Sequence, residues 1–309
     1  MAECRKTAEY YLGIDGGGTK TALLLCDRNG NTVGETVTAA CNPMDIGFER
    51  AFDILRRAIN EVCGDIPHEK IAMFAGIAGG GSADAIGKLS DFFAQFGFLV
   101  YANEGDNRNI LEAGLGPRDG ISVIIGTGIY VQAKRGDTLY RAGGWGYFID
   151  RGGSGFNLGR DALDAYYAAY DGSGAQTLLT ELIEAQTDCT PGALVSRIYA
   201  GGKTFVASFA PLVSEASRRG DRIADEILTR NTEYIAHLIL TVERNLPDEM
   251  DEIPVVLCGG LSRDAEIVSR LERLLSVHGR LKIECLSREP VWGAAMAAKK
   301  LAETEGSSC

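Results

Sequence analysis

The segment from Gly13 to Thr21 combines residue types that bind phosphate. An apolar run, Tyr10 to Ile14, ends at Asp15; three glycines and Thr19 follow, and a second apolar run extends from Ala22 to Cys26. Glycines without a Cβ atom can adopt positive φ and let backbone amides approach an anion, Thr19 adds a hydroxyl, and Asp15 can hold hydrated Mg²⁺. The pattern favours a phosphate-binding hairpin loop, and a Gly-rich turn without a ligand is the alternative.

Two other phosphate-binding motifs do not fit the chain. Gly202-Lys203-Thr204 imitates the end of a Walker A loop, but Arg197 stands where that motif has its first glycine. A dinucleotide-binding fingerprint opens a helix, whereas Thr19 leads into an apolar, strand-like run. We therefore expect strand, phosphate loop and strand in sequence.

The same hairpin pattern occurs a second time. A strand at residues 121–125 leads to Gly126-Thr127-Gly128, a second strand runs to Lys134, and a third starts at Thr138. A turn-rich link follows Gly114, so we expect two similar lobes, residues 1–117 and 118–290, with a closing helix at 291–305 that packs back on the first lobe.

Alternating helices and strands in both halves predict an α/β fold. We expect strands at residues 71–77, 98–102 and 255–257, and helices at residues 50–63, 84–96, 156–170, 203–218, 221–246 and 291–303.

Composition limits the partners of the chain. Its 309 residues carry a formal net charge of -11 without a cluster of Lys and Arg, which argues against a nucleic-acid surface. The apolar runs are shorter than a membrane span, and Met1 to Lys6 form no signal-peptide core, so we expect no membrane partner and a cytoplasmic location. Eight cysteines without a C-x-x-C pair predict reduced thiols.

Several different glycine-containing motifs follow one another along the chain. Besides the two hairpin loops, they are Asn42-Pro43, Gly76 to Gly81, Gly143-Gly144-Trp145-Gly146, Ser154 to Arg160, Gly220-Asp221 and Cys258-Gly259-Gly260. This set resembles the BadF/BadG/BcrA/BcrD-type ATPase family, on its N-acetylglucosamine kinase-like branch of the actin, heat-shock chaperone and sugar kinase superfamily. The resemblance implies two similar lobes of ribonuclease H-like (actin-like ATPase) fold around an ATP cleft, and an ATP-dependent carbohydrate kinase.

The resemblance also implies roles at the nucleotide. Asp15 would order Mg²⁺, while Gly16, Gly17, Gly18, Thr19 and Lys20 would meet the phosphates of ATP from one lobe. Gly126, Thr127 and Gly128 would meet them from the other lobe, and Gly259 and Gly260 would pass beside the adenosine. Phosphoryl transfer needs charge neutralisation and alignment more than covalent chemistry, so backbone amides and Mg²⁺ suffice.

A kinase also needs a carboxylate that takes the proton of the acceptor hydroxyl. Counting back from Gly126 to the position of this residue in the family gives Asp106, which we prefer. Glu104 is the competitor, because Asn103-Glu104 imitates an Asn-Asp pair that the family often has. In the alternative reading both are solvated loop carboxylates.

The acceptor sugar is expected at residues that the resemblance places nearby. Asn42 would bind an acceptor hydroxyl, Gly79 and Asp150 would line the site, and Trp145 with Gly144 would form a wall, although a core position is the simpler reading of one Trp.

The chain departs from the family at two places where the sugar should lie. Ile129-Tyr130 and Arg151-Gly152 stand where the family has polar residues. Unpaired buried polar groups cost about 1–3 kcal/mol each, which disfavours N-acetylglucosamine as the acceptor. Arg151 brings a cation, so the hypothesis is a different, anionic sugar derivative; alternatively Arg151 points to solvent and pairs with a surface carboxylate.

Two other functions stay open. The same family contains ATPases that activate 2-hydroxyacyl-CoA dehydratases and hold an iron–sulfur cluster at a dimer interface, but no cysteine here follows the characteristic glycine motifs. A nucleotide- or sugar-binding regulator without turnover is the other alternative. The expected partner is a small-molecule sugar, and a homodimer is left open.

Overall fold

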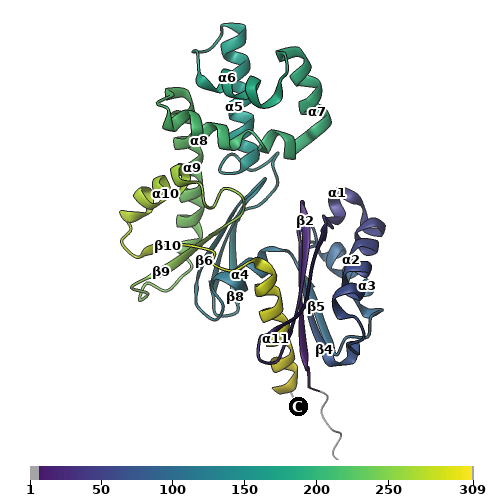
Figure 1. The fold of residues 1–309 in the computed structure, drawn as a ribbon. Coiled ribbons are helices and arrows are strands. Elements are labelled where there is room, and N and C mark those ends of the chain that lie inside the picture. Colours follow the sequence, from purple (N-terminus) through teal and green to yellow (C-terminus); the bar gives the residue numbers. More distant parts are fainter. Residues whose placement is uncertain (1–6, 308–309) are drawn as a thin grey trace, which may run out of the picture. The chain divides into compact units, whose positions relative to one another are not determined.

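The computed structural model describes residues 7–307, so Cys4 and Cys309 lie outside the described residues. The chain forms two compact units, one made of residues 7–117 with 286–307 and the other of residues 118–285. Each unit contains one five-stranded sheet (Figure 1). The six described cysteines are free thiols, and Cys26, Cys41 and Cys63 are buried.

The first sheet has the strand order β3-β2-β1-β4-β5. Strands β1, β2 and β3 form an antiparallel meander, and β4 and β5 continue parallel to β1. The strands are β1 (Tyr10–Gly16), β2 (Lys20–Asp27), β3 (Thr32–Ala39), β4 (Ile71–Ile77) and β5 (Val100–Glu104).

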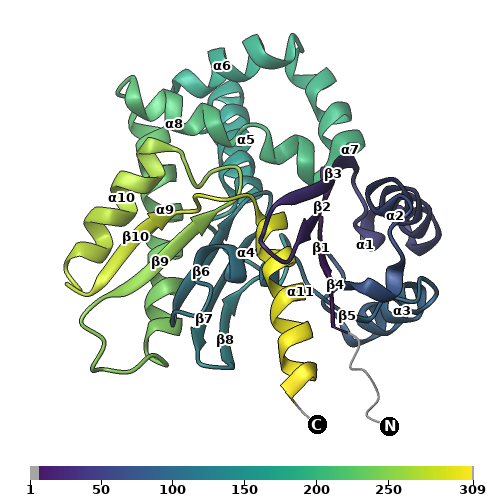
Figure 2. The same ribbon diagram turned by 60° about the horizontal axis from the view of Figure 1, so that its bottom comes forward.

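Helices cover both faces of this sheet (Figure 2). Helices α2 (Phe48–Cys63) and α3 (Ala83–Ala94) pack on one face, where Leu12 and Ile14 belong to the core. The opposite face carries Tyr11 and receives α11 (Pro290–Ser307), which also packs on α4 (Asn107–Gly114). The alternation of side chains along β1 therefore serves two cores. Short helices α1 (Pro43–Ile46) and η1 (His68–Lys70) complete the unit.

The second sheet repeats the topology of the first. Its order is β8-β7-β6-β9-β10, again with an antiparallel meander followed by two parallel strands. The strands are β6 (Gly120–Ile125), β7 (Ile129–Arg135), β8 (Thr138–Gly143), β9 (Ile253–Cys258) and β10 (Leu281–Cys285). The predicted α/β class and the repeated hairpin are confirmed.

Six helices complete the second unit around one large apolar core. They are α5 (Gly155–Asp171), α6 (Leu178–Thr187), α7 (Pro191–Ala207), α8 (Ala210–Arg218), α9 (Arg222–Glu243) and α10 (Ala265–Ser276). In the described part of the chain no helix is long and apolar enough to cross a membrane.

Two sequence expectations are wrong in detail. The single helix expected at residues 203–218 is two helices, because α7 ends before Ser208 and α8 starts with Pro211 in its first turn, where a missing N–H costs nothing. The strand expected at residues 98–102 lies two residues later, and Phe98 is instead buried in the core. Helices α6 and α10 and strand β10 were not expected.

Candidate active site

The first glycine loop is a tight hairpin between β1 and β2. The amide of Gly17 donates to the carbonyl of Lys20 at 2.9 Å, and Gly18 and Thr19 are exposed. None of the three loop glycines, Gly16, Gly17 and Gly18, has a positive φ, so the expectation of left-handed backbone here is wrong. The need for glycine is steric: a Cβ atom on Gly16 would lie 2.5 Å from Cys41 Sγ and 2.5 Å from Ile77 Cδ1.

Asp15 lies at the end of β1, where parallel strands bring polar residues together. It is in register with Gly76 on β4, which is in register with Glu104 on β5. The amide of Asn109, on α4, donates to Asp15 Oδ1 at 2.7 Å and is the one hydrogen-bond partner of this carboxylate among residues 7–307. The second carboxylate oxygen is therefore left for a ligand.

The pKa values of two aspartates in this unit are raised. Burial raises the pKa of Asp15 to about 6; the hydrogen bond from Asn109 opposes the rise, the charge of Asp106 adds to it, and Lys20 lowers it. Burial also raises the pKa of Asp106, against backbone hydrogen bonds from Asn107 and from Asp106 itself. The ionised form of both carboxyl groups is therefore disfavoured relative to a carboxyl group in water.

Asp106 and Glu104 occupy different positions in the fold. Glu104 is the last residue of β5, whereas Asp106 occupies the N-cap position of α4. The electrostatic coupling of Asp106 to Asp15 and Cys41 brings it to the end of β1. Both candidates thus lie at the same edge of the sheet, and burial raises the pKa of Asp106.

The side chain of Asn42 forms local hydrogen bonds and lies beside Gly79. Its Oδ1 accepts from the amide of Met44 at 3.0 Å and caps α1, and its Nδ2 donates to Asp45 Oδ2 at 2.8 Å. A Cβ atom on Gly79 would lie 2.3 Å from Asn42 Oδ1. The structure therefore brings Asn42 and Gly79 together.

In the second unit, the loop Gly126 to Gly128 packs against two other segments. The amides of Gly155 and Phe156, in the first turn of α5, donate to the carbonyls of Gly126 and Thr127 at 2.7 and 3.2 Å. Gly259 has φ of 100°, and a Cβ atom there would lie 2.6 Å from the carbonyl of Ile125. The structure thus brings the predicted phosphate and adenosine loops of this unit together.

Asp150 organises the Gly143 to Gly146 loop. Its Oδ2 accepts from the amides of Trp145 and Gly146 at 3.0 Å each, and burial raises its pKa. Gly143, Gly144 and Gly146 all have positive φ, which favours glycine at each position. The carboxylate expected at the substrate is thus bound to the backbone of the loop that carries Trp145.

Trp145 is exposed over 61% of its surface, so it is not a core aromatic residue. The guanidinium of Arg141 lies 3.8 Å from the centre of its ring, in a cation–π arrangement. Tyr130 lies beside the neighbouring Gly144, since a Cβ atom on Gly144 would be 2.4 Å from Tyr130 Cδ2. Trp145 thus has one face covered by Arg141.

The residues at the two departures from the family pattern differ in exposure, with Arg151 on the surface and Ile129 in the core. Arg151 is exposed and forms no hydrogen bond or ion pair within the described chain, so the alternative in which it pairs with a surface carboxylate is not observed. Ile129 is 2% exposed and packs near Gly153.

Sequence reasoning missed Asn109 and Arg141. The signals available were an Asn one helical turn after Asp106 and a cation two residues before the Gly-Gly-Trp segment. Neither is specific, because only the fold shows that Asn109 reaches Asp15 and that Arg141 covers Trp145.

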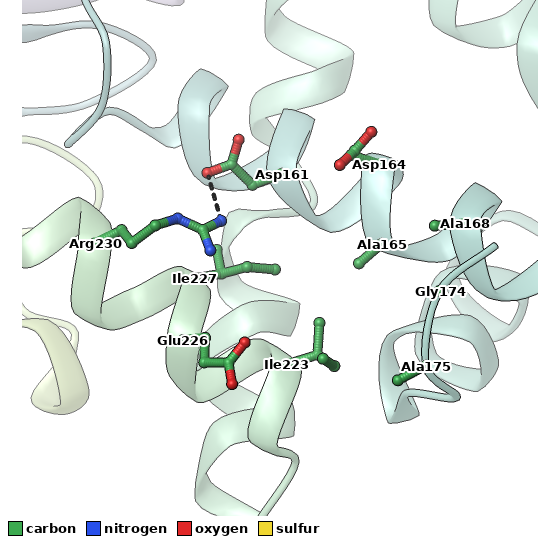
Figure 3. A pocket seen from close by; sticks show the side chains of 10 residues that line it. All are labelled: Asp161, Asp164, Ala165, Ala168, Gly174, Ala175, Ile223, Glu226, Ile227 and Arg230. Atoms are coloured by element: carbon green, nitrogen blue, oxygen red, sulfur yellow. Dashed lines mark ion pairs between the residues drawn. The ribbon is translucent and has the colours of Figure 1, made fainter.

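A pocket of about 190 Å³ lies between α5 and α9 (Figure 3). Asp161, Asp164, Glu226 and Arg230 give it a charged rim, and Asp161 pairs with Arg230 at 3.6 Å. None of the predicted site residues lines it.

The sequence model of the BadF/BadG/BcrA/BcrD ATPase family matches residues 12–298 of this chain. The chain belongs to this family. It is 25% identical over 304 residues to an N-acetylmuramic acid/N-acetylglucosamine kinase of Clostridium acetobutylicum, covering 94% of this chain and 98% of that protein.

Two further similar proteins match over nearly the whole of this chain. An N-acetyl-D-glucosamine kinase of Dictyostelium discoideum is 26% identical over 313 residues, covering 94% of this chain and 98% of that protein. The structure of a Chromobacterium violaceum protein, provisionally assigned as an N-acetylglucosamine kinase, superposes with a TM-score of 0.78 and 26% identity, covering 94% of this chain and 99% of that one. The family resemblance read from the glycine motifs is confirmed.

The donor set at Asp15 fits a hydrated magnesium ion. Mg²⁺ prefers oxygen ligands and keeps several waters, so one or two carboxylates together with nucleotide phosphates hold it. Asp15 offers a free oxygen, and Asp106 adds a second negative charge nearby. Within residues 7–307 no three His, Cys, Asp or Glu side chains gather as a complete metal site.

Asp15→Asn is expected to stabilise the free protein at pH 8 and to leave its stability unchanged at pH 4. The folded pKa of about 6 lies above the unfolded value of about 4, so the ionised carboxylate costs stability that appears as the pH rises between them. The gain should be about 1–3 kcal/mol, visible as a higher melting temperature. Exposed Asp65 provides the control, and a lower melting temperature of Asp15→Asn at pH 8 would contradict the assignment.

Gly16→Ala should destabilise the first unit by about 1–3 kcal/mol, because its Cβ atom would overlap Cys41 and Ile77. Gly18→Ala is the matched control: its Cβ atom would meet only Asp45 Oδ2, at 3.9 Å, and should change stability by less than about 0.5 kcal/mol. Thermal unfolding followed by circular dichroism compares the two, and equal melting temperatures would refute the steric explanation.

Proposed function

We propose that this chain is an ATP-dependent carbohydrate kinase that phosphorylates a hydroxyl of an amino sugar or a related sugar. Membership of an ATPase family supports nucleotide use. Two relatives that match nearly the whole chain are named as N-acetylglucosamine kinases, one of them also for N-acetylmuramic acid.

The observation that carries the proposal is the pair of aspartates beside the first glycine hairpin. Asp15 ends β1 at the hairpin, and Asp106 is close enough to raise its pKa. Phosphoryl transfer to an alcohol requires a carboxylate to order the metal and another to take a proton. In this proposal Asp15 has the first role and Asp106 the second, with Glu104 as its competitor.

Burial suits Asp106 to proton transfer. A carboxylate with a raised pKa is a stronger base near neutral pH, and the backbone hydrogen bond from Asn107 fixes its direction. Asp106 would accept the proton of the acceptor hydroxyl at a carboxylate oxygen while that hydroxyl oxygen bonds to the terminal phosphorus of ATP, the bond from this phosphorus to the bridging oxygen breaks, and ADP leaves.

The glycine loops would bind the nucleotide. Exposed backbone at Gly18, Thr19 and Gly128 supports amide contacts to phosphate, and Lys20 adds a positive charge. Exposed Gly259 and Gly260 would pass beside the adenosine. A magnesium ion at Asp15 would neutralise charge on the transferred phosphate.

In the second unit the candidate for binding the acceptor is Trp145, and in the first unit the candidates are Asn42 and Gly79. Sugar rings present C–H groups that pack on aromatic faces, and Trp145 has an exposed ring fixed from one side by Arg141. Asp150 would act indirectly, by holding the backbone of the Trp145 loop.

We infer further that the acceptor carries a negative charge. Arg151 is exposed and unpaired in the described chain, next to the loop that carries Trp145. N-acetylmuramic acid, named for one relative, bears a carboxylate that N-acetylglucosamine lacks. A guanidinium binds a carboxylate through charge-assisted hydrogen bonds, which supports an acceptor of this class.

Asp106→Asn is expected to lower kcat for sugar phosphorylation by about 10²–10⁴-fold and to leave the Kd for Mg·ADP within about two-fold, because only the proton acceptor is lost. Glu104→Gln is the matched control and should retain most activity. Phosphosugar formation by mass spectrometry and nucleotide binding by calorimetry report the two properties. If only Glu104→Gln loses turnover, Glu104 and not Asp106 is the proton acceptor. If no acceptor yields a phosphosugar, the proposal is overturned.

Arg151→Ala should lower kcat/KM for N-acetylmuramic acid about 10-fold relative to that for N-acetylglucosamine, because one charge-assisted hydrogen bond is lost. Arg151→Lys should keep part of the preference. Arg222→Ala removes the same charge from an exposed pair with Glu226 and should not change the ratio. An unchanged ratio in Arg151→Ala would exclude the anionic acceptor.

A further inference from the structure

Asn109 connects three groups at the end of the first sheet. Its Nδ2 donates to Asp15 Oδ1 at 2.7 Å, to the carbonyl of Gly76 at 3.1 Å and to the carbonyl of Ile14 at 3.2 Å. The residue is fully buried in α4. One amide therefore joins β1, β4 and the carboxylate that follows Ile14.

Two glycines allow other elements to approach Asn109 closely, Gly76 at its side chain and Gly293 at its backbone. A Cβ atom on Gly76 would lie 2.2 Å from Asn109 Oδ1, and one on Gly293, in α11, would lie 1.9 Å from the carbonyl of Asn109. A Cβ atom on Gly76 would displace the Asn109 amide from the end of the sheet, and one on Gly293 would push α11 and α4 apart. Gly76 thus leaves the space in which the Asn109 side chain reaches Asp15.

This placement has an energetic cost. Asn109 Oδ1 is buried without a hydrogen-bond partner among the described residues, and such a group costs about 1–3 kcal/mol. An apolar side chain would avoid the orphaned oxygen. A costly polar group at this position is better explained by what its Nδ2 does for Asp15 than by stability.

We propose that Asn109 is a positioning residue that orients Asp15 for magnesium, an inference that rests on the proposed function. By engaging Oδ1, the amide fixes the plane of the carboxylate and leaves the other oxygen for a water of the hydrated ion. Groups that orient metal ligands in this way change metal affinity about 10–100-fold when they are removed.

Asn109→Ala should raise the Mg²⁺ concentration needed for half-maximal ADP binding about 10-fold, while Mg²⁺-free ADP binding changes less than about two-fold. Calorimetry at stepped Mg²⁺ concentrations measures both values. Asn109→Ser gives a smaller change of volume and should have the same effect. In the Asp15→Asn background, Asn109→Ala should add nothing.

Asn103→Ala is the matched control. Asn103 is also buried in the first unit, and its Nδ2 holds a backbone carbonyl, that of Ile86 at 3.1 Å, without contact to Asp15. Its loss should lower stability but leave the Mg²⁺ requirement unchanged. If Asn103→Ala and Asn109→Ala raise the requirement equally, or if neither does, Asn109 is only structural.

The unmodified protein provides a measurement that does not depend on folding of the variants. The ¹⁵N side-chain amide resonance of Asn109 should shift when Mg²⁺ is added to the ADP complex, and that of Asn103 should not. An unmoved Asn109 resonance overturns the inference. If the unmodified protein binds no ADP with Mg²⁺, the proposed function fails instead, so the two failures are distinguishable.

Discussion

The first unit depends on keeping two carboxylates close together in surroundings that water only partly reaches. Asp15 and Asp106 repel each other, and burial penalises the ionised form of both. The chain offsets this with the amide of Asn109, the charge of Lys20 and the backbone donors at Asp106. The compensation is incomplete, since both pKa values stay raised. The free protein therefore has a local excess of negative charge that a hydrated cation would balance.

Steric demands at glycines explain how the supporting elements come so close. A Cβ atom on Gly13 would lie 2.3 Å from the amide nitrogen of Ala295, so α11 lies directly on β1. Gly76 leaves room for the side chain of Asn109, and Gly293 lets α11 approach the backbone of α4. These glycines have ordinary negative φ and serve close packing, unlike Gly144 or Gly259, whose φ is positive. Elements from both ends of the sequence are thus needed to build the surroundings of Asp15.

Features that depend on interactions between neighbouring residues could be predicted from the sequence, and features that depend on contacts between distant residues could not. The hairpins at Gly16 and Gly126 are local, and their order along the chain was sufficient to predict the repeated sheets. Asn109 could not be predicted, because its bond to Asp15 spans 94 residues and depends on the packing of α4. The break between α7 and α8 was missed because helical periodicity continues across Ser208. Steric contacts, and not φ, explain Gly16, and no local pattern separates these two uses of glycine.

The second unit suggests how an acceptor would be distinguished. Asp150 uses one carboxylate oxygen for the backbone of the Trp145 loop, and Ile129 is part of the core. What this loop region exposes is an aromatic face and two guanidinium groups, those of Arg141 and Arg151. Buried polar partners reject an analogue that lacks one hydroxyl by several orders of magnitude, whereas exposed stacking and charge discriminate far less. Selection by this surface would therefore depend on the charge and shape of the acceptor, and would tolerate changes in single ring hydroxyls.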